Sequence, residues 1–285
     1  MSAVAESPYA VARTVGDPED CHFYHTMEVP GVGVVTGQWD LRQGVSEYLG
    51  NVALDGKRVL EIGTASGFLC FEMERRGAEV VAYDLSEGTG ALDIVPFGGD
   101  RDPQWAADWS EVIRKVNNAF WLAHERFDSR ARVVYGSVYE VPDSIGAVDV
   151  ATFGCVLLHL RDPFLALERT LRLVRETVIV VEPAPRPARA LAHLPSWAQA
   201  PLVRSRLLPG GLGFLPDHRA GLPNAWWSLQ PWGLARMLGV LGFELAAVGF
   251  HTQGYANGAS RMYTLVAKRP SGETAPVLRN SQPGR

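Results

Sequence analysis

The stretch KRVLEIGTASGFLCFEMERRGAEVVAYDLSE, residues 57–87, decides the fold, because it predicts a strand, a glycine turn, a helix and a second strand in one short unit. Residues 58–62 form a short, mostly apolar run that suits a buried parallel strand, and Gly63 follows where the chain must turn. Gly67 lets the backbone come close to a ligand, and Gly77 stands where a helix C-cap belongs. A unit of this kind is half of a nucleotide-binding α/β fold.

Asp84 ends the second strand, residues 79–85, where a carboxylate accepts hydrogen bonds from both hydroxyls of a ribose. The turn EIGTASG has one glycine fewer than the G-x-G-x-x-G pattern of dinucleotide folds, and Glu61 is unfavourable beside a pyrophosphate. An acidic residue suits a cationic nucleoside that carries an amino acid, such as S-adenosylmethionine (SAM). The simpler alternative is a tight structural turn in another α/β protein.

Four segments of the chain resemble class I SAM-dependent methyltransferases, and more narrowly the bacterial relatives of the enzyme that carboxymethylates wobble uridine in tRNA. These segments are HTMEVPGVGVVTGQWDLR (25–42), GTASGFLCFEMERRGAEVVAYD (63–84), LLHLRDPFLAL (157–167) and NAWW (224–227). Their conjunction in this order is more specific than the glycine motif alone, and it leaves the acceptor open. The resemblance implies an α/β, Rossmann-like fold: a mostly parallel seven-stranded sheet with a terminal antiparallel hairpin and a substrate cap.

The predicted elements and domains follow that order. Strands are expected at 132–138, 147–155 and 177–181, with an antiparallel pair at 242–250 and 261–268, and helices at 41–50, 102–127, 164–173 and 231–241. The predicted domains are an N-terminal arm and lid (1–50), a SAM-binding core (51–183), a cap (184–230), a C-terminal helix and hairpin (231–269) and a tail (270–285).

The resemblance also implies a SAM site at the carboxyl edge of the sheet. The arm, residues 22–42, would cover the amino-acid end of SAM, although glycines and aromatics in this span also fit a β-hairpin that seals the core. Adenine would meet the Ser137 hydroxyl or the Val138 backbone. The expected cofactor residues are Glu61, Gly63, Thr64, Gly67, Asp84, Leu85, Ser137, Val138 and Gly154, with Gln38, Trp39 and Arg42 from the arm.

His159 is the first candidate for the general base, since it follows a strand end and imidazole can take a proton near neutral pH. The alternative is a histidine held by structural hydrogen bonds. Tyr24 and His25 are the second choices. Tyr24 and His159 are also predicted to contact the acceptor.

The proline- and arginine-rich residues 184–224 predict a long loop, and a loop of this length is usually functional, so we expect a substrate cap here. Trp226 and Trp227 follow it. In an extended segment two consecutive side chains point to opposite sides, so one tryptophan should face the cap or the pocket. Both could instead be buried between cap and sheet. The tryptophans favour a flat, aromatic acceptor such as an indole or a phenol of specialised metabolism.

The composition of the chain makes some classes of binding partner unexpected. A net charge of −4 and a pI near 6.0 make a nucleic-acid footprint unexpected. The three cysteines are Cys21, Cys70 and Cys155; their odd number and wide spacing suit a reducing cytosol, and no metal-binding motif is present. No run of eighteen apolar residues occurs, so we expect no membrane contact and a cytoplasmic protein. The oligomeric state stays open.

The sequence therefore predicts a SAM-dependent methyltransferase that acts on a small, aromatic molecule. Two alternatives remain. One is transfer of a carboxymethyl or methyl group to a tRNA uridine, and the other is a SAM-binding module without catalysis.

Overall fold

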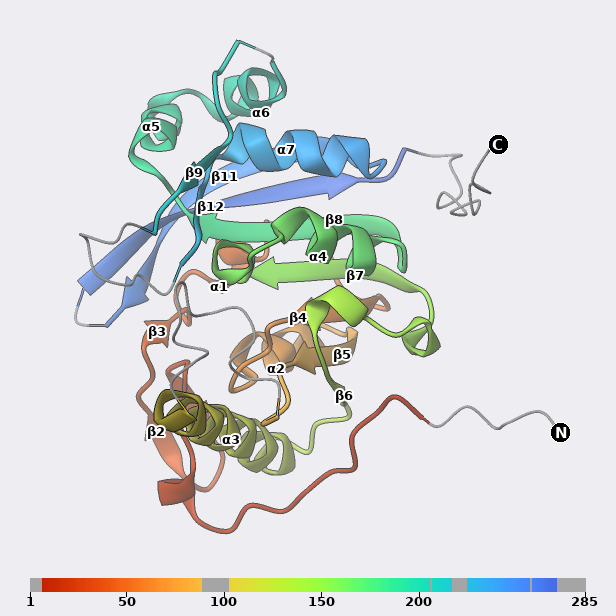
Figure 1. Ribbon diagram of the computed structural model, residues 1–285, viewed down its shortest axis with the longest axis vertical. Coiled ribbons are helices and arrows are strands. Elements are labelled where there is room, and N and C mark those ends of the chain that lie inside the picture. The colour runs from red at the N-terminus through yellow and green to blue at the C-terminus, as the bar shows by residue number, and fades with distance from the viewer. Residues whose placement is uncertain (1–6, 89–102, 206, 217–224, 257, 271–285) are drawn as a thin grey trace, which may run out of the picture.

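A large mixed sheet runs through the computed structural model, which describes residues 7–88, 103–205, 207–216, 225–256 and 258–270 (Figure 1). Its eight strands lie in the order β3-β11-β12-β8-β7-β4-β5-β6. Five neighbouring strands are parallel: β4 (Arg58–Ile62), β5 (Glu79–Asp84), β6 (Arg132–Tyr135), β7 (Val148–Gly154) and β8 (Val174–Pro183). The mostly parallel, Rossmann-like fold is confirmed.

The other three strands are antiparallel. β11 (Glu244–Tyr255) and β12 (Gly258–Lys268) form the expected terminal hairpin, and β12 pairs with β8. The eighth strand was not predicted. It is β3 (Trp39–Asp40), and it pairs with the far end of β11 through Asp40 and Gly254. The sheet therefore has one strand more than the seven expected, because the hairpin is long enough to receive the N-terminal arm.

Two apolar clusters cover the two faces of the sheet, as alternation along buried parallel strands requires. Leu60 and Ile62 belong to one cluster, which includes side chains of α4 (Pro163–Leu171) and α7 (Pro231–Val240). Val59 belongs to the other, together with side chains of α1 (Val45–Tyr48), α2 (Phe68–Arg75) and α3 (Pro103–Arg126). Figure 1 shows α4 and α7 on the near face of the sheet.

Capping residues set several of the helix ends. Asp162 accepts a hydrogen bond from the Leu165 N–H and Pro163 stands in the first turn, so α4 begins at the predicted position. Gly77, at φ +87°, ends the turn after α2 as a helix C-cap glycine does. The predicted helix 41–50 is shorter than expected, since only Val45–Tyr48 is helical. Asp102, the predicted cap of α3, lies outside the described residues.

The N-terminal arm contains the β-hairpin that was one of its two interpretations. β1 (Met27–Val29) pairs with β2 (Gly33–Val35), and Met27 and Val29 are buried in the cluster that contains α2. A short 3-10 helix, η1 (Pro18–Asp20), precedes it. The hairpin thus closes one face of the core.

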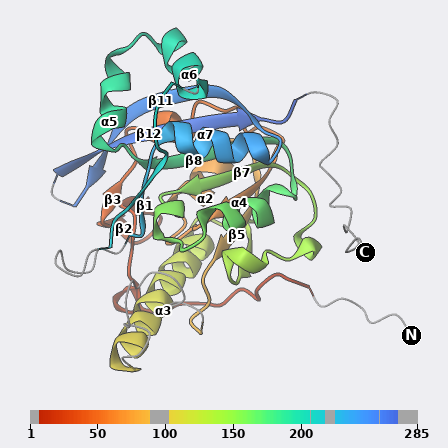
Figure 2. The ribbon, with the colours of Figure 1, turned by 45° about the horizontal axis from the view of Figure 1, so that its top comes forward.

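The prediction of a long loop in the cap is wrong for most of its described residues. Helices α5 (Arg186–Arg189) and α6 (Ser196–Arg204), the 3-10 helix η6 (Ala190–His193) and the ribbon β9 (Leu212–Phe214) with β10 (Trp227–Leu229) occupy it. The prolines of this segment predict a loop, but Pro187 and Pro195 stand at helix starts, where a missing N–H costs little. Figure 2 shows α5 and α6 beside β11.

Candidate active site

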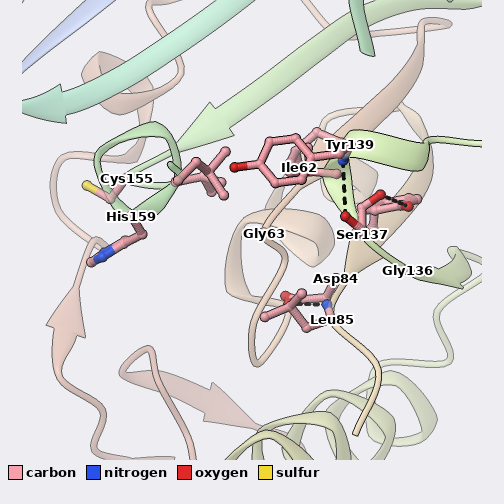
Figure 3. A pocket seen from close by; sticks show the side chains of 13 residues that line it. Ile62, Gly63, Asp84, Leu85, Gly136, Ser137, Tyr139, Cys155 and His159 are labelled. Atoms are coloured by element: carbon pink, nitrogen blue, oxygen red, sulfur yellow. Dashed lines mark hydrogen bonds between the residues drawn. The ribbon is translucent and has the colours of Figure 1, made fainter. Parts of the chain in front are cut away.

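A pocket opens where β4, β5, β6 and β7 end, which is where open α/β sheets bind ligands. Three turns follow these strands: η3 (Val138–Glu140), η4 (Asp143–Ile145) and η5 (Leu157–His159). In Figure 3, Asp84 and Leu85 stand on one side of the pocket, and Cys155 and His159 on the other. The pocket is lined by Ile62, Gly63, Tyr83, Asp84, Leu85, Gly136, Ser137, Val138, Tyr139, Cys155, Val156, His159 and Leu160.

The glycine turn forms the floor of this pocket. Gly63 has φ +80°, its N–H donates to the Tyr83 carbonyl at 2.8 Å, and a Cβ atom there would stand 2.4 Å from Cγ2 of Val156. Gly67 is constrained as well, at φ +89°, but its missing side chain makes room for Phe71 rather than for the pocket. Of the two glycines only Gly63 lines the pocket.

Asp84 is oriented by backbone N–H groups. Its Oδ2 accepts from Ala65 at 2.6 Å and its Oδ1 from Leu85 at 2.7 Å. Burial raises the pKa of the Asp84 carboxyl, while these two bonds lower it. Each carboxylate oxygen has a second lone pair, so the group can still accept two hydroxyl hydrogen bonds from a ligand.

Glu61 and Thr64 lie beneath the turn and do not line the pocket. The Thr64 hydroxyl donates to Oε2 of Glu61 at 2.7 Å, whereas Oε1 is buried and has no hydrogen-bond partner among the described residues. Burial raises the pKa of Glu61 to about 8; the Thr64 hydrogen bond lowers it and the nearby Asp84 raises it further.

The two residues predicted to meet adenine, Ser137 and Val138, both line the pocket, and so does the predicted cofactor residue Leu85. The Ser137 hydroxyl accepts from the Tyr139 N–H at 3.3 Å, and the Ser137 carbonyl accepts from the Tyr83 hydroxyl at 2.8 Å (Figure 3). Tyr83 and Tyr139 were not predicted as site residues. Tyr83 is the last residue but one of β5, and Tyr139 lies in η3, the turn that follows β6; their places beside the carboxyl edge of the sheet are the signal that could have found them.

His159 lines the pocket from η5, on the side away from Asp84. Cys155, the first residue after β7, is also in the lining; it adopts φ +56°, and burial raises the pKa of its thiol well above its usual range. The preceding Gly154 does not line the pocket. A Cβ atom there would stand 2.8 Å from the Tyr48 hydroxyl, so this glycine makes room for that ring.

The arm is fastened to the glycine turn by Ser66, which sequence reasoning missed. The backbone N–H groups of Tyr24 and His25 both donate to the Ser66 hydroxyl at 3.1 Å. Trp39 is buried, and its indole N–H donates to the Tyr24 hydroxyl at 3.3 Å. The arm therefore lies against the turn, although Tyr24, His25 and Trp39 do not line the pocket itself.

The two second-choice bases have unfavourable protonation properties near neutral pH. Burial lowers the pKa of His25 to about 4, and its Nδ1 has no hydrogen-bond partner among the described residues. Burial raises the pKa of Tyr24 to about 12. Neither shift suits a group that must take a proton near pH 7.

Gln38 and Arg42 are not brought to the pocket. The Gln38 amide donates to the Tyr255 hydroxyl at 3.3 Å. The Arg42 guanidinium holds both oxygens of Asp40, at 2.9 and 2.7 Å, and lines a separate hollow with Glu28 and Glu72. The Arg42–Asp40 pair is half exposed, so it contributes little to stability.

Trp226 and Trp227 flank the turn that carries His159. The Trp226 backbone N–H donates to the Leu158 carbonyl at 2.8 Å, and the Trp227 indole N–H donates to the Leu160 carbonyl at 2.9 Å. The Trp227 ring packs against the apolar cluster that includes side chains of α4 and α7. The Arg161 guanidinium stands 5.3 Å from the Trp226 ring centre. Both rings also lie beside the Phe214 ring, with centroids 6.2 and 5.5 Å from it, and neither tryptophan lines the pocket, so the expectation that one of them faces the pocket is wrong for this pocket.

No group of three or more His, Cys, Asp or Glu side chains in the described ranges could hold a metal ion. Among the helices of this part of the chain, none has the length and apolarity needed to cross a bilayer.

The profile of a methyltransferase-domain family matches residues 38–231, which is more than half of the chain. Magnesium protoporphyrin IX methyltransferase of Synechocystis PCC 6803 with bound S-adenosylhomocysteine (SAH) is 17% identical, with a TM-score of 0.48, over 81% of this chain and 82% of that one. The 1,6-didemethyltoxoflavin-N1-methyltransferase of Burkholderia thailandensis is 16% identical, with a TM-score of 0.48, over 80% of this chain and 77% of that one.

A short stretch of 56 residues is 41% identical to the biotin biosynthesis bifunctional protein BioHC of Cellvibrio japonicus (strain Ueda107). It covers 20% of this chain and 10% of that protein, so the chain matches about a tenth of this curated relative.

Proposed function

The chain belongs to the methyltransferase-domain family and uses SAM as its methyl donor, and from this premise we propose that it methylates a small, flat, aromatic acceptor such as an indole or a phenol. One observation carries the proposal: Asp84 and His159 face a single pocket from opposite sides, at the carboxyl edge of a parallel sheet. One side can hold a nucleoside and the other can take a proton.

The residues present fit SAM. Asp84 offers a carboxylate already oriented by two N–H groups, and Gly63, at φ +80°, lets the turn pass against Val156 at the pocket floor, where a Cβ atom would not fit. In the proposed arrangement Asp84 would hold the ribose, while Leu85, Ser137, Val138 and Tyr139 would surround the adenine. When bound, SAM supplies an electrophilic methyl group on a sulfonium. Glu61 stays outside this arrangement, since its Oε1 is buried beneath the turn and does not reach the pocket.

The other residues act on the acceptor. His159 would accept the proton that the attacking atom loses, since it lines the pocket beside the apolar side chains of Val156 and Leu160. These apolar neighbours and the aromatic ring of Tyr139 exclude water and favour a flat acceptor. Trp226 is placed next to the same turn and would orient the acceptor from the cap.

The test uses methyl-labelled SAM and an extract of the organism that makes the protein, containing both its small molecules and its tRNA. Mass spectrometry should find the label in a small aromatic product. Label in tRNA uridine, together with retention of tRNA on a filter, would replace the proposal by the nucleic-acid alternative. SAM binding by calorimetry without turnover of any acceptor in the extract would indicate a binding module.

A further inference from the structure

The turn that carries His159 is bonded from two directions. On the sheet side, the Leu157 N–H donates to Oε1 of Glu182 at 3.0 Å, and the Leu158 N–H also bonds to the Glu182 carboxyl group. On the cap side, the carbonyls of Leu158 and Leu160 accept from the two tryptophans. The turn is therefore clamped between β8 and the cap, and Glu182 is its attachment to the sheet.

Glu182 is an unusual residue to find at this position. It is the last residue but one of β8, and only 1% of its surface is exposed. The ionisable groups that act on it or feel its charge are Tyr48, Cys155 and Tyr263, and no Lys, Arg or His within the described ranges forms an ion pair with it. Its Oε2 has no hydrogen-bond partner among the described residues.

Burial without a cation is costly for a carboxyl group. It raises the pKa of Glu182 to about 8, while the hydrogen bonds from Leu157 and Leu158 lower it. An apolar side chain would fill the same space without this cost. What an apolar side chain could not do is accept the two backbone N–H groups at the start of η5, and buried N–H groups without an acceptor are rare in folded proteins.

We propose that Glu182 is a positioning residue: its carboxyl group holds the two N–H groups that begin η5, and so fixes where the His159 imidazole stands in the pocket. The inference rests on the proposed function, in which His159 takes the acceptor proton. His159 is one residue beyond the second of these amides, so a change in the turn displaces its side chain directly. Proton transfer depends on placement at hydrogen-bond range, and a displacement of about 1 Å is enough to lower turnover strongly.

The experiment follows the His159 imidazole itself, in the full-length protein with bound SAH. The ¹H–¹³C resonance of its Cε1 is assigned with a His159→Gln variant. Glu182→Met fills the site but accepts no hydrogen bond, and it should shift or broaden this resonance while the affinity for SAH stays within about twofold. Glu182→Gln keeps an acceptor oxygen and should leave the resonance in place.

A control on the same strand is Glu176→Met, since Glu176 is exposed and pairs with Lys57 at 2.7 Å. It should change nothing at His159. An unchanged His159 resonance in a folded, SAH-binding Glu182→Met variant overturns the inference. So does an equal shift in the Gln variant, because that would implicate charge rather than hydrogen bonding.

If Glu182→Met does not fold, amide hydrogen exchange in the wild-type protein decides. The Leu157 and Leu158 amides should exchange at least about 100-fold more slowly than unprotected ones, and unprotected rates at either amide overturn the inference. Failure of the proposed function looks different: labelled SAM would then yield no methylated small molecule with the wild-type protein, whatever the position of the His159 resonance.

Discussion

The two sides of the pocket are assembled in different ways. Asp84 is oriented by Ala65, only 19 residues away, within one strand–turn–helix–strand unit. On the opposite side, the turn of His159 depends on Glu182, 25 residues away, and on Trp227, whose indole bonds Leu160 across 67 residues. The proposed ribose position is therefore set within one local unit, whereas the proposed acceptor side exists only when distant segments meet. Variants should accordingly separate binding of SAM from turnover.

The largest effect should come from closing the nucleoside side. At Gly63 the φ angle is +80°, and a Cβ atom would stand 2.4 Å from Cγ2 of Val156. Gly63→Val should therefore abolish SAM binding, measured by calorimetry, while the fold persists. Gly56→Val is the matched control, because Gly56 has φ +66° and nothing lies within 4 Å of its Cβ position. Retained affinity in the Gly63 variant would place the cofactor elsewhere.

The acceptor side should respond in turnover instead. His159→Ala should lower kcat by about 10² to 10⁴ if the imidazole is the general base, with little change in the Kd for SAM. The assay uses the acceptor found with labelled SAM, and kcat is followed against pH. Full activity with an unshifted pH profile would assign His159 a structural role.

Asp84→Ala should weaken SAM binding by about 1.5–3 kcal/mol, since the ribose loses a charged acceptor. The Ala variant also releases the N–H groups of Ala65 and Leu85, so Asp84→Asn, which keeps one acceptor oxygen, is measured beside it. Calorimetry should rank the affinities as wild type, Asn, then Ala. Equal affinities for all three would mean that the ribose lies elsewhere.

A further prediction concerns His25 of the N-terminal arm and the pH dependence of the stability of the protein. Burial lowers the pKa of His25 from 6.5 to about 4, so the unfolded chain takes up a proton at a higher pH than the folded protein does. Stability from this residue is therefore complete above about pH 6.5 and falls as the pH drops toward 4, by about 2 kcal/mol between pH 7.5 and 5.

In urea unfolding of the ligand-free protein, His25→Phe should lose that part of the pH dependence. His22→Gln, at an exposed position, should keep it. An identical pH slope in the wild type and the His25 variant would show that the imidazole is solvated.

The smallest effect concerns the cap. Trp226→Ala should raise the acceptor KM by about two- to tenfold, the equivalent of 0.5–1.5 kcal/mol, and leave the melting temperature nearly unchanged. Trp227→Ala should lower the melting temperature, because it removes the bond to Leu160 and packing against the core. Loss of stability in both variants with unchanged KM would remove the main support for an aromatic acceptor.

The same contrast explains what the sequence could predict. Strand periodicity predicted that Asp84 lies at the sheet edge, and it lines the pocket there, because spacing within one βα unit fixes which residues reach that edge. Arg42 could not be placed this way, since Asp40, two residues away, takes its guanidinium. The role of Glu182 could not be predicted, since its contact with Leu157 depends on the end of β8 and the turn η5 meeting in space. In the cap, a high proline content predicts a loop, whereas some of these prolines stand at the starts of helices.

The length of the terminal hairpin has a consequence for synthesis of the chain. The ring of Tyr255, near its tip, packs at a tilt of 50° against Trp39 with the ring centroids 4.5 Å apart, and its hydroxyl accepts a hydrogen bond from Gln38, 217 residues earlier. On a ribosome, Trp39 and Asp40 are therefore made long before the strand with which they pair, so β3 can join the sheet only after β11 has emerged. A nascent chain that stops before residue 254 would contain Asp84 and His159 and still lack the partner of β3, so the sheet gains its eighth strand only after the hairpin is made.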